Sequence, residues 1–230
     1  MKERDQIVAE VREHVSRDLA ARFRMEQEAK LSAYRELNRN IRKHGTLFTG
    51  SSLMEQFPVA EFCLSAGLPV VVYNRGIGGY TTDDFLKAAD VMLLDPLPKK
   101  LFINIGTNDI RPMPEGEDWF THLSENYLAI CGIIRDRLPD TAVFMMAYYP
   151  VNEDKMREVS PVPPVRTNEA IRKANRMVAD LARAFSFRYI DVNDGLKDAG
   201  GQLQAEHTAD GIHFDAAAYR TVFDRLRQYL

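Results

Sequence analysis

The chain alternates short apolar runs with longer stretches of helical periodicity, and this alternation is the feature that most constrains its fold. The apolar runs are β-branched or aromatic nearly throughout: TLFT (46–49), PVVVY (69–73), KLFINI (100–105), TAVFMMAY (141–148) and FRYIDV (187–192). Apolar residues recur at helical spacing between them, as in 117–138 and 167–186. Strand, helix and strand in repetition predict parallel strands joined by right-handed crossovers. We therefore expect an α/β fold, a three-layer α/β/α sandwich around a five-stranded parallel sheet.

Both ends of the chain show helical stripes. The closing segment DAAAYRTVFDRLRQYL places four apolar residues on one face: Tyr219, Val222, Phe223 and Leu226. At the other end, residues 4–43 read as one long or broken helix, with a stripe of Val8, Val11, Val15, Leu19 and Phe23 flanked by charges. We expect residues 1–43 to be a helical extension of a main domain at 44–230. Packing against that domain is the favoured interpretation, and a homodimer arm is the alternative.

The segment PVNEDKMREVSPVPPVR (150–166) does not follow the alternation of strands and helices. It is rich in proline and charge, and its pattern is too irregular for a regular element. We predict a long surface loop that borders a site.

Composition narrows the class of protein. With 230 residues, of which 45% are hydrophobic, the chain can bury one large core. A formal net charge of −3 with both signs interspersed gives no basic face for nucleic acid and no polybasic membrane anchor. The start has no signal-peptide core, and no run reaches the ~20 apolar residues of a membrane span, so we expect a cytoplasmic protein. Cys63 and Cys131 lie in apolar-periodic segments, which favours reduced, buried thiols.

In an open parallel sheet, ligands bind outside the carboxyl ends of the strands. The residues that follow the first three expected strands are GSS, NRGIGG and GTND, and DGIHF follows the fifth after a loop. These clusters supply a hydroxyl, flexible backbone amides, a side-chain amide, and a histidine with an aspartate three residues before it. This inventory fits acyl transfer.

Four motifs carry a family resemblance. GSSL (50–53), NRGIGGYTT (74–82), GTND (106–109) and DGIH (210–213) resemble, in order, the four blocks of the SGNH hydrolases, also called the GDSL esterase/lipase family. The second block is especially similar to that of the acetylhydrolases acting on platelet-activating factor and their bacterial relatives. The resemblance spans about residues 46–230 and implies the flavodoxin-like SGNH hydrolase fold. One position departs from the family pattern, because Ser51 stands where the first block usually has Asp.

The resemblance implies a role for each matching residue. Ser52 matches the nucleophile, His213 the general base and Asp210 the residue that holds the other ring nitrogen of that histidine. The Ser52 and Gly79 backbone N–H groups and the Asn108 side-chain amide match the oxyanion hole. Taken alone, the serines also read as helix caps, 76–79 as a tight turn and Asn108 as a turn residue. Only the four blocks together favour the catalytic interpretation.

Other ligands find little support in the sequence. No pair of histidines has metal-ligand spacing, so we propose no metal. A G-x-G-x-x-G dinucleotide loop starting at Gly76 would need glycine where Thr81 stands, so we expect no cofactor. Four residues after the second to fourth strands are candidates to line the substrate pocket: Tyr80, Arg111, Tyr148 and Tyr149.

The sequence thus predicts a serine esterase that forms an acyl-enzyme on Ser52 and cleaves a carboxylic ester with a short acyl group. The resemblance allows short-chain acyl esters, acetylated sugars, lysophospholipids or thioesters, and the residues do not rank them. The alternative is a non-catalytic ligand-binding module that retains the hydrolase fold.

Overall fold

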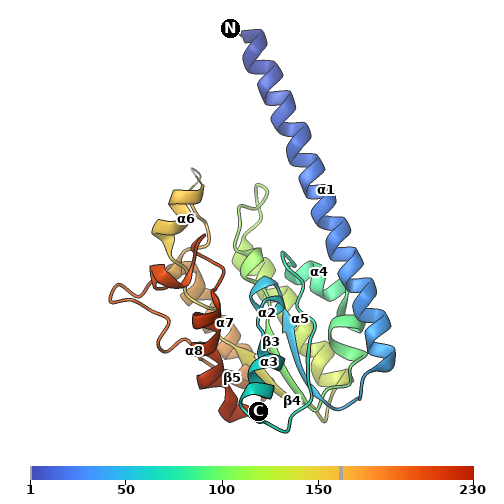
Figure 1. The fold of residues 1–230 in the computed structure, drawn as a ribbon. Coiled ribbons are helices and arrows are strands. Elements are labelled where there is room, and N and C mark those ends of the chain that lie inside the picture. Colours follow the sequence, from blue (N-terminus) through green and yellow to red (C-terminus); the bar gives the residue numbers. More distant parts are fainter. Residues whose placement is uncertain (1, 161–162) are drawn as a thin grey trace.

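A five-stranded parallel sheet forms the centre of the molecule (Figure 1). This computed structural model describes residues 2–160 and 163–230, without the side chains of 2–5, 7–9 and 12. The strands lie in the order β2-β1-β3-β4-β5, with all neighbouring pairs parallel. Their bounds are Thr46–Gly50 (β1), Val72–Asn74 (β2), Lys100–Asn104 (β3), Ala142–Met146 (β4) and Arg188–Ile190 (β5).

Helices follow the strands and cover both faces of the sheet. The α-helices are Lys2–Asn40 (α1), Ser52–Glu55 (α2), Val59–Ser65 (α3), Thr82–Lys87 (α4), Trp119–Arg137 (α5), Glu153–Val159 (α6), Asn168–Ala184 (α7) and Ala216–Leu226 (α8). Shorter turns are η1 (Asp90–Leu94), η2 (Thr107–Asp109), η3 (Ala205–His207) and η4 (Arg227–Tyr229).

Alternation along the strands divides the core into two layers. Side chains of successive strand residues point to opposite faces, so Leu47 joins the cluster beneath α4, α5 and α7, and Phe48 joins the cluster beneath α3 and α8. On the second face, Phe48, Phe102 and Phe144 are paired in register, and their rings stack at centroid distances of 4.6 Å. The predicted α/β/α sandwich is confirmed. So is the apolar face of the C-terminal helix, because Tyr219, Val222, Phe223 and Leu226 are all buried.

The prediction of a loop throughout 150–166 is wrong, because α6 occupies Glu153–Val159. Asn152 caps this helix by accepting a hydrogen bond from the Lys155 N–H at 2.9 Å. Arg157 pairs with Glu153 and Asp154 one turn earlier. Residues 161 and 162 of the expected loop lie outside the described residues.

The long helix α1 packs against the domain only along its C-terminal half. Gln27 and Asn38 are buried there, whereas Val11, Val15 and Leu19 are at least half exposed. The N-terminal half extends beyond the rest of the molecule (Figure 1). The side chain of Val8, predicted to belong to the same stripe, lies outside the described residues.

Two smaller expectations concern cysteines and membranes. Cys63 and Cys131 are buried and neither forms a disulfide, and burial raises the pKa of the Cys131 thiol to about 12. Within residues 2–160 and 163–230, no helix is both long and apolar enough to cross a membrane.

Candidate active site

Ser51 and Ser52 follow β1 at a sharp turn into α2. A Cβ on Gly50 would lie 2.0 Å from the Asn104 carbonyl oxygen of β3, so only glycine fits where the chain turns. Ser51 occupies the N-cap position of α2, but its side chain makes no capping hydrogen bond and the residue is 2% exposed. Ser52 is partly exposed. Helix capping therefore does not account for either hydroxyl.

The structure brings Ser52 to the Asp210–His213 turn, although 161 residues separate Ser52 from His213 in the sequence. Ser52 Oγ lies 2.9 Å from His213 Nε2, and His213 Nδ1 lies 2.6 Å from Asp210 Oδ2. The His213 side chain is 38% exposed, so solvent and small molecules reach the ring. The three side chains form a continuous chain from a hydroxyl through an imidazole to a carboxylate.

A compact turn fixes the aspartate and the histidine relative to each other. Asp210 Oδ1 accepts hydrogen bonds from the Ile212 and His213 N–H groups, both at 2.8 Å. Burial opposes ionisation of Asp210, but the hydrogen bonds from His213 and Ile212 outweigh it and hold the pKa of this carboxyl below its ordinary value. A charged Asp210 favours the His213 tautomer that carries its proton on Nδ1, which leaves Nε2 as an acceptor for the Ser52 hydroxyl.

The loop that contains Gly78 and Gly79 is held by α1 and α2. The Gly78 N–H donates to Glu55 Oε2 at 2.5 Å, and the Gly78 carbonyl accepts from Gln27 Nε2 at 2.6 Å. Lys30 of α1 pairs with the other oxygen of Glu55 at 2.5 Å. These contacts were not predicted from the sequence, because α1 precedes the motifs and its charged residues resemble an ordinary solvated face.

Gly79 has a left-handed backbone with φ of 74°. A Cβ at this position would lie 2.5 Å from the Phe23 ring of α1. Both observations require glycine next to the candidate oxyanion hole, and they also place Phe23 at its edge.

Asn108 lies in η2, directly after β3. Its Nδ2 donates to the Tyr80 carbonyl at 2.9 Å, and its Oδ1 accepts from Arg166 Nη2 at 2.7 Å. The contact with Arg166 was not predicted, since Arg166 lies 58 residues later in a segment interpreted as an irregular loop. The neighbouring Asp109 is buried, and it accepts hydrogen bonds from the Thr82 N–H and hydroxyl.

Two of the four residues predicted to line the substrate pocket are buried in the core instead. Tyr148 and Tyr149 are almost completely buried, because the Tyr148 hydroxyl donates to the Ile105 carbonyl and the Tyr149 ring packs on Phe214. They belong to the core and are not available to a substrate.

Tyr80 and Arg111 differ from those two tyrosines. Tyr80 is 6% exposed and lines a cavity shared with α1, and the group it places at Asn108 is its backbone carbonyl. Arg111 is exposed on the segment after η2.

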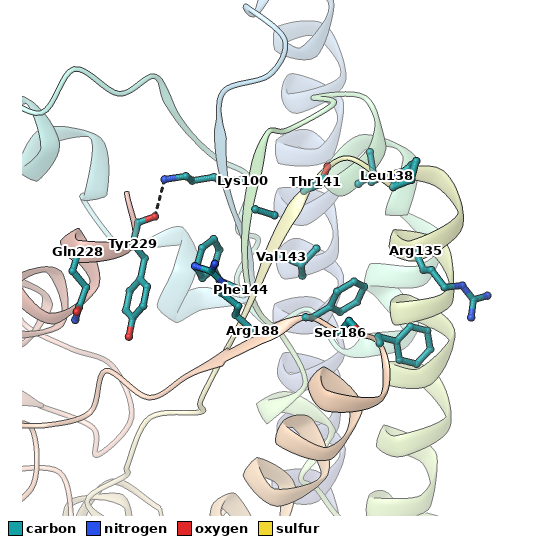
Figure 2. Close-up of a pocket in the computed structure, with 14 residues that line it drawn as sticks. Lys100, Arg135, Leu138, Thr141, Val143, Phe144, Ser186, Arg188, Gln228 and Tyr229 are labelled. Carbon is teal, nitrogen blue, oxygen red and sulfur yellow. Dashed lines mark hydrogen bonds between the residues drawn. The ribbon is translucent and has the colours of Figure 1, made fainter.

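A larger cavity lies at the opposite end of the sheet. It has a volume of about 650 Å³ and is lined by the first residues of three strands, Lys100, Ala142 and Arg188, together with Phe144 and Tyr229 (Figure 2). Because the candidate residues follow the carboxyl ends of the strands, this cavity is separate from them.

One cluster of the described residues has donor atoms close enough to hold a metal ion: Asp83, Asp109 and His122 lie within 4.8 Å of one another. Hydrogen bonds already engage these donors. His122 Nε2 lies 2.8 Å from Asp83 Oδ2, and Asn126 donates to Asp83 Oδ1. The cluster therefore ties α4 to α5 through direct contacts.

A parallel sheet with a hydroxyl, an imidazole and a carboxylate aligned at its carboxyl edge defines a protein of the hydrolase class. The model of the GDSL-like Lipase/Acylhydrolase family matches residues 48–221. The chain belongs to this family and is a hydrolase that acts on esters. No curated protein matches the chain with significance.

Solved structures share the fold. A protein from Streptococcus pneumonia, named for platelet activating factor, is 31% identical, with a TM-score of 0.82 over 94% of this chain and 97% of that one. A Bacteroides fragilis protein described as an acylhydrolase is 20% identical, with a TM-score of 0.68 over 85% and 93%. The acetylxylan esterase Axe2 from Geobacillus stearothermophilus is 16% identical, with a TM-score of 0.61 over 81% and 96%.

Proposed function

We propose that the protein is a serine esterase that cleaves a short-chain carboxylic ester through an acyl-enzyme on Ser52. The observation that carries this proposal is the contact of 2.9 Å between Ser52 Oγ and His213 Nε2, with Asp210 at 2.6 Å from the other ring nitrogen. A serine hydroxyl is a weak nucleophile by itself, and an adjacent general base activates it.

The first half of the reaction transfers the acyl group to the enzyme. Ser52 Oγ attacks the ester carbonyl carbon while His213 Nε2 takes the hydroxyl proton. The tetrahedral intermediate collapses by breaking the bond to the alkoxy oxygen, and His213 gives its proton to that leaving group. In the second half, water attacks the acyl carbon and gives a proton to His213, which returns it to Ser52 Oγ as the carboxylic acid leaves.

Three N–H donors stabilise the negative oxygen of the tetrahedral intermediate in this proposal: the Ser52 and Gly79 backbone amides and the Asn108 side chain. Because α2 is only one turn long, its helix dipole adds little, and the individual donors carry the effect. Loss of one such donor typically costs about 3 kcal/mol of transition-state stabilisation.

The names of the structural neighbours support a preference for a short acyl group. Two of the structural neighbours are named acetyl xylan esterases, and the most identical of the three described above is named for platelet activating factor.

Hydrolysis of p-nitrophenyl acetate, butyrate and octanoate tests the proposal. We expect the acetate ester to give the highest kcat/KM, and Ser52→Ala to lower kcat by about 10⁴-fold or more. Ser51→Ala is the matched control and should keep most of the activity. Retention of activity in Ser52→Ala would overturn the nucleophile, and a preference for octanoate would overturn the short acyl group.

A further proposal concerns the oligomeric state of the enzyme. We propose that the exposed stripe of α1 pairs with that of a second copy, because Val11, Val15 and Leu19 remain uncovered in the single chain. Sedimentation equilibrium tests this: the double variant Val15→Asp, Leu19→Asp should be monomeric if the wild type is a dimer, and a monomeric wild type would contradict the pairing.

A cytoplasmic location stays a prediction from the sequence.

A further inference from the structure

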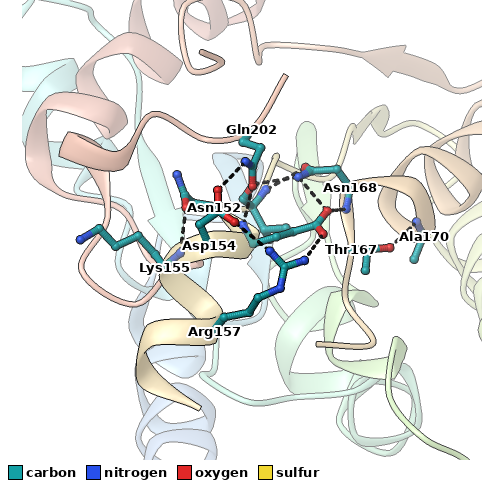
Figure 3. A network of polar contacts seen from close by, with 10 residues as sticks. Asn152, Asp154, Lys155, Arg157, Thr167, Asn168, Ala170 and Gln202 are labelled. Carbon is teal, nitrogen blue, oxygen red and sulfur yellow. Dashed lines mark hydrogen bonds and ion pairs between the residues drawn. The ribbon is translucent and has the colours of Figure 1, made fainter. Parts of the chain in front are cut away.

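Arg166 lies directly before α7, in a segment that is held in place by hydrogen bonds of the next two residues, Thr167 and Asn168. Thr167 caps α7 by accepting a hydrogen bond from the Ala170 N–H at 3.2 Å. The Asn168 side chain pairs with both backbone groups of Val151, at 3.1 Å and 2.9 Å. The Asn168 N–H also donates to Glu153 Oε1 of α6 at 2.9 Å, so this network joins the start of α7 to α6 (Figure 3). The backbone next to Arg166 is therefore fixed to the segment that follows β4.

The guanidinium group of Arg166 reaches the candidate oxyanion hole from this anchor. Its Nη2 donates to Asn108 Oδ1 at 2.7 Å. Its Nε is buried and has no hydrogen-bond partner among the described residues. Burial lowers the pKa of Arg166 to about 10, against the opposing effect of the Asp109 and Asp210 carboxylates. The group is thus still charged at neutral pH.

The two contacts of the Asn108 amide leave only one orientation. Arginine can only donate hydrogen bonds, so the amide atom facing Arg166 must be the oxygen. The Tyr80 carbonyl can only accept, so the atom facing it must be the nitrogen. In a flipped amide, the nitrogen would face the Arg166 donor and the oxygen would face the Tyr80 carbonyl, and neither pair could form a hydrogen bond. Of the two hydrogens on Nδ2, one is used by Tyr80 and the other remains for a ligand.

We propose that Arg166 is a positioning residue that fixes and polarises the Asn108 amide as an oxyanion donor. The proposal rests on the proposed function of Asn108. A charge-assisted hydrogen bond to Oδ1 withdraws electron density from the amide and makes Nδ2–H a stronger donor. Arg166 touches neither the reacting atoms nor the substrate in this account, and its whole effect on turnover passes through Asn108.

A double-mutant cycle tests this dependence with p-nitrophenyl acetate as substrate. The variants are Arg166→Met, Asn108→Ala and the double variant, each measured for kcat, KM and melting temperature. Arg183→Met is the matched control, because Arg183 lies on α7 with its side chain 80% exposed. We expect Arg166→Met to lower kcat by about tenfold or more with KM changed less than about threefold, since the effect falls on the transition state. In the Asn108→Ala background the same change should cost about twofold or less.

The outcomes separate this inference from the proposed function. An equal loss of kcat from Arg166→Met in both backgrounds would overturn the positioning role while the oxyanion hole stands. Wild-type kcat in Asn108→Ala would instead remove Asn108 from the site. If Arg166→Met does not melt cooperatively, Arg166→Lys completes the same cycle, because lysine keeps the charge and lacks the planar fork that fits the amide.

Discussion

Two adjacent serines have different environments, and this difference is decided by single residues around the turn. Gly50 lets the chain turn beside β3, Ser51 is buried, and only Ser52 reaches His213. Sequence motifs predicted the residues of this cluster because the glycine, serine, asparagine and histidine each lie next to a strand end or in the last loop. They did not predict Glu55, Gln27 or Arg166, whose contacts join residues far apart in the sequence.

Asp210→Asn should separate charge from geometry at the triad. Asparagine can still accept the backbone hydrogen bonds made to Oδ1, but its amide replaces the anionic Oδ2 that faces His213 Nδ1. We expect the fold to be kept and kcat to fall by about 10⁴-fold, as when the aspartate of a serine-protease triad is replaced by asparagine. Steady-state kinetics with a melting curve measure this, and a kcat within tenfold of the wild type would remove Asp210 from the mechanism.

At the scale of elements, α1 acts as a support for the loop that contains Gly78 and Gly79. Tyr34, Gln27 and Lys30 contact the Gly76 carbonyl, the Gly78 carbonyl and Glu55, respectively. The sequence predicted a helix over these residues and an apolar stripe only up to Phe23. It did not indicate which residues would meet the loop, because polar residues on a charged helix carry no sign of their tertiary partners.

Gln27→Ala should therefore reduce turnover although Gln27 belongs to the N-terminal helix. Removing its hydrogen bond frees the Gly78 carbonyl, which costs about 1 kcal/mol of stability and loosens the neighbouring Gly79 donor. We expect kcat to fall by about threefold to tenfold. Gln6→Ala on the projecting half of α1 is the control, since Gln6 contacts only Glu10 of the same helix among the described residues. Equal kcat in the two variants would contradict a supporting role for α1.

The contact between α4 and α5 should make stability depend on pH. The hydrogen bond to Asp83 raises the pKa of His122 above 6.5, so its stabilisation is full below pH 6.5 and is lost as pH rises through the folded-state pKa. Burial opposes ionisation of Asp83, but hydrogen bonds from His122 and Asn126 lower its pKa below 3.8. Its contribution is full above pH 3.8 and is lost as pH falls through the lowered pKa.

The window of full stabilisation for this pair lies between those two values. We expect the melting-temperature difference between wild type and His122→Gln to be largest near pH 5 and to shrink by about pH 9. His14→Gln is the control, because the His14 side chain is 71% exposed on α1. A difference independent of pH would show that the Asp83 contact does not perturb the titration of His122.

The whole molecule was the most predictable level. The buried strands alternate with helical segments so regularly that the sheet, its parallel direction and its two covered faces follow from the pattern. The exception is α6, which was interpreted as loop because nearby prolines masked an asparagine cap and charge pairs one turn apart. The environment of the projecting part of α1 was not predictable either, since an apolar stripe in a sequence does not indicate which surface packs against it.

Metal removal tests the mechanism at the level of the whole protein. In the proposed reaction, His213 carries every transferred proton, Asp210 holds the imidazole, and three N–H groups stabilise the oxyanion. His122 hydrogen-bonds to Asp83, Asn126 donates to Asp83, and Asp109 accepts a hydrogen bond from the Thr82 hydroxyl. We expect kcat/KM for p-nitrophenyl acetate to be unchanged after dialysis against EDTA. A loss that a divalent cation restores would contradict the metal-free mechanism.

The most direct test of the central claim is to locate the covalent adduct of a serine-reactive phosphonate. The wild-type protein is labelled, digested and analysed by peptide mass spectrometry, with Ser51→Ala and Ser52→Ala treated in parallel. We predict one adduct, on Ser52, which persists in Ser51→Ala and disappears in Ser52→Ala, because His213 activates only the Ser52 hydroxyl. An adduct on Ser51, or undiminished labelling of Ser52→Ala, would contradict the assignment of Ser52 as the nucleophile.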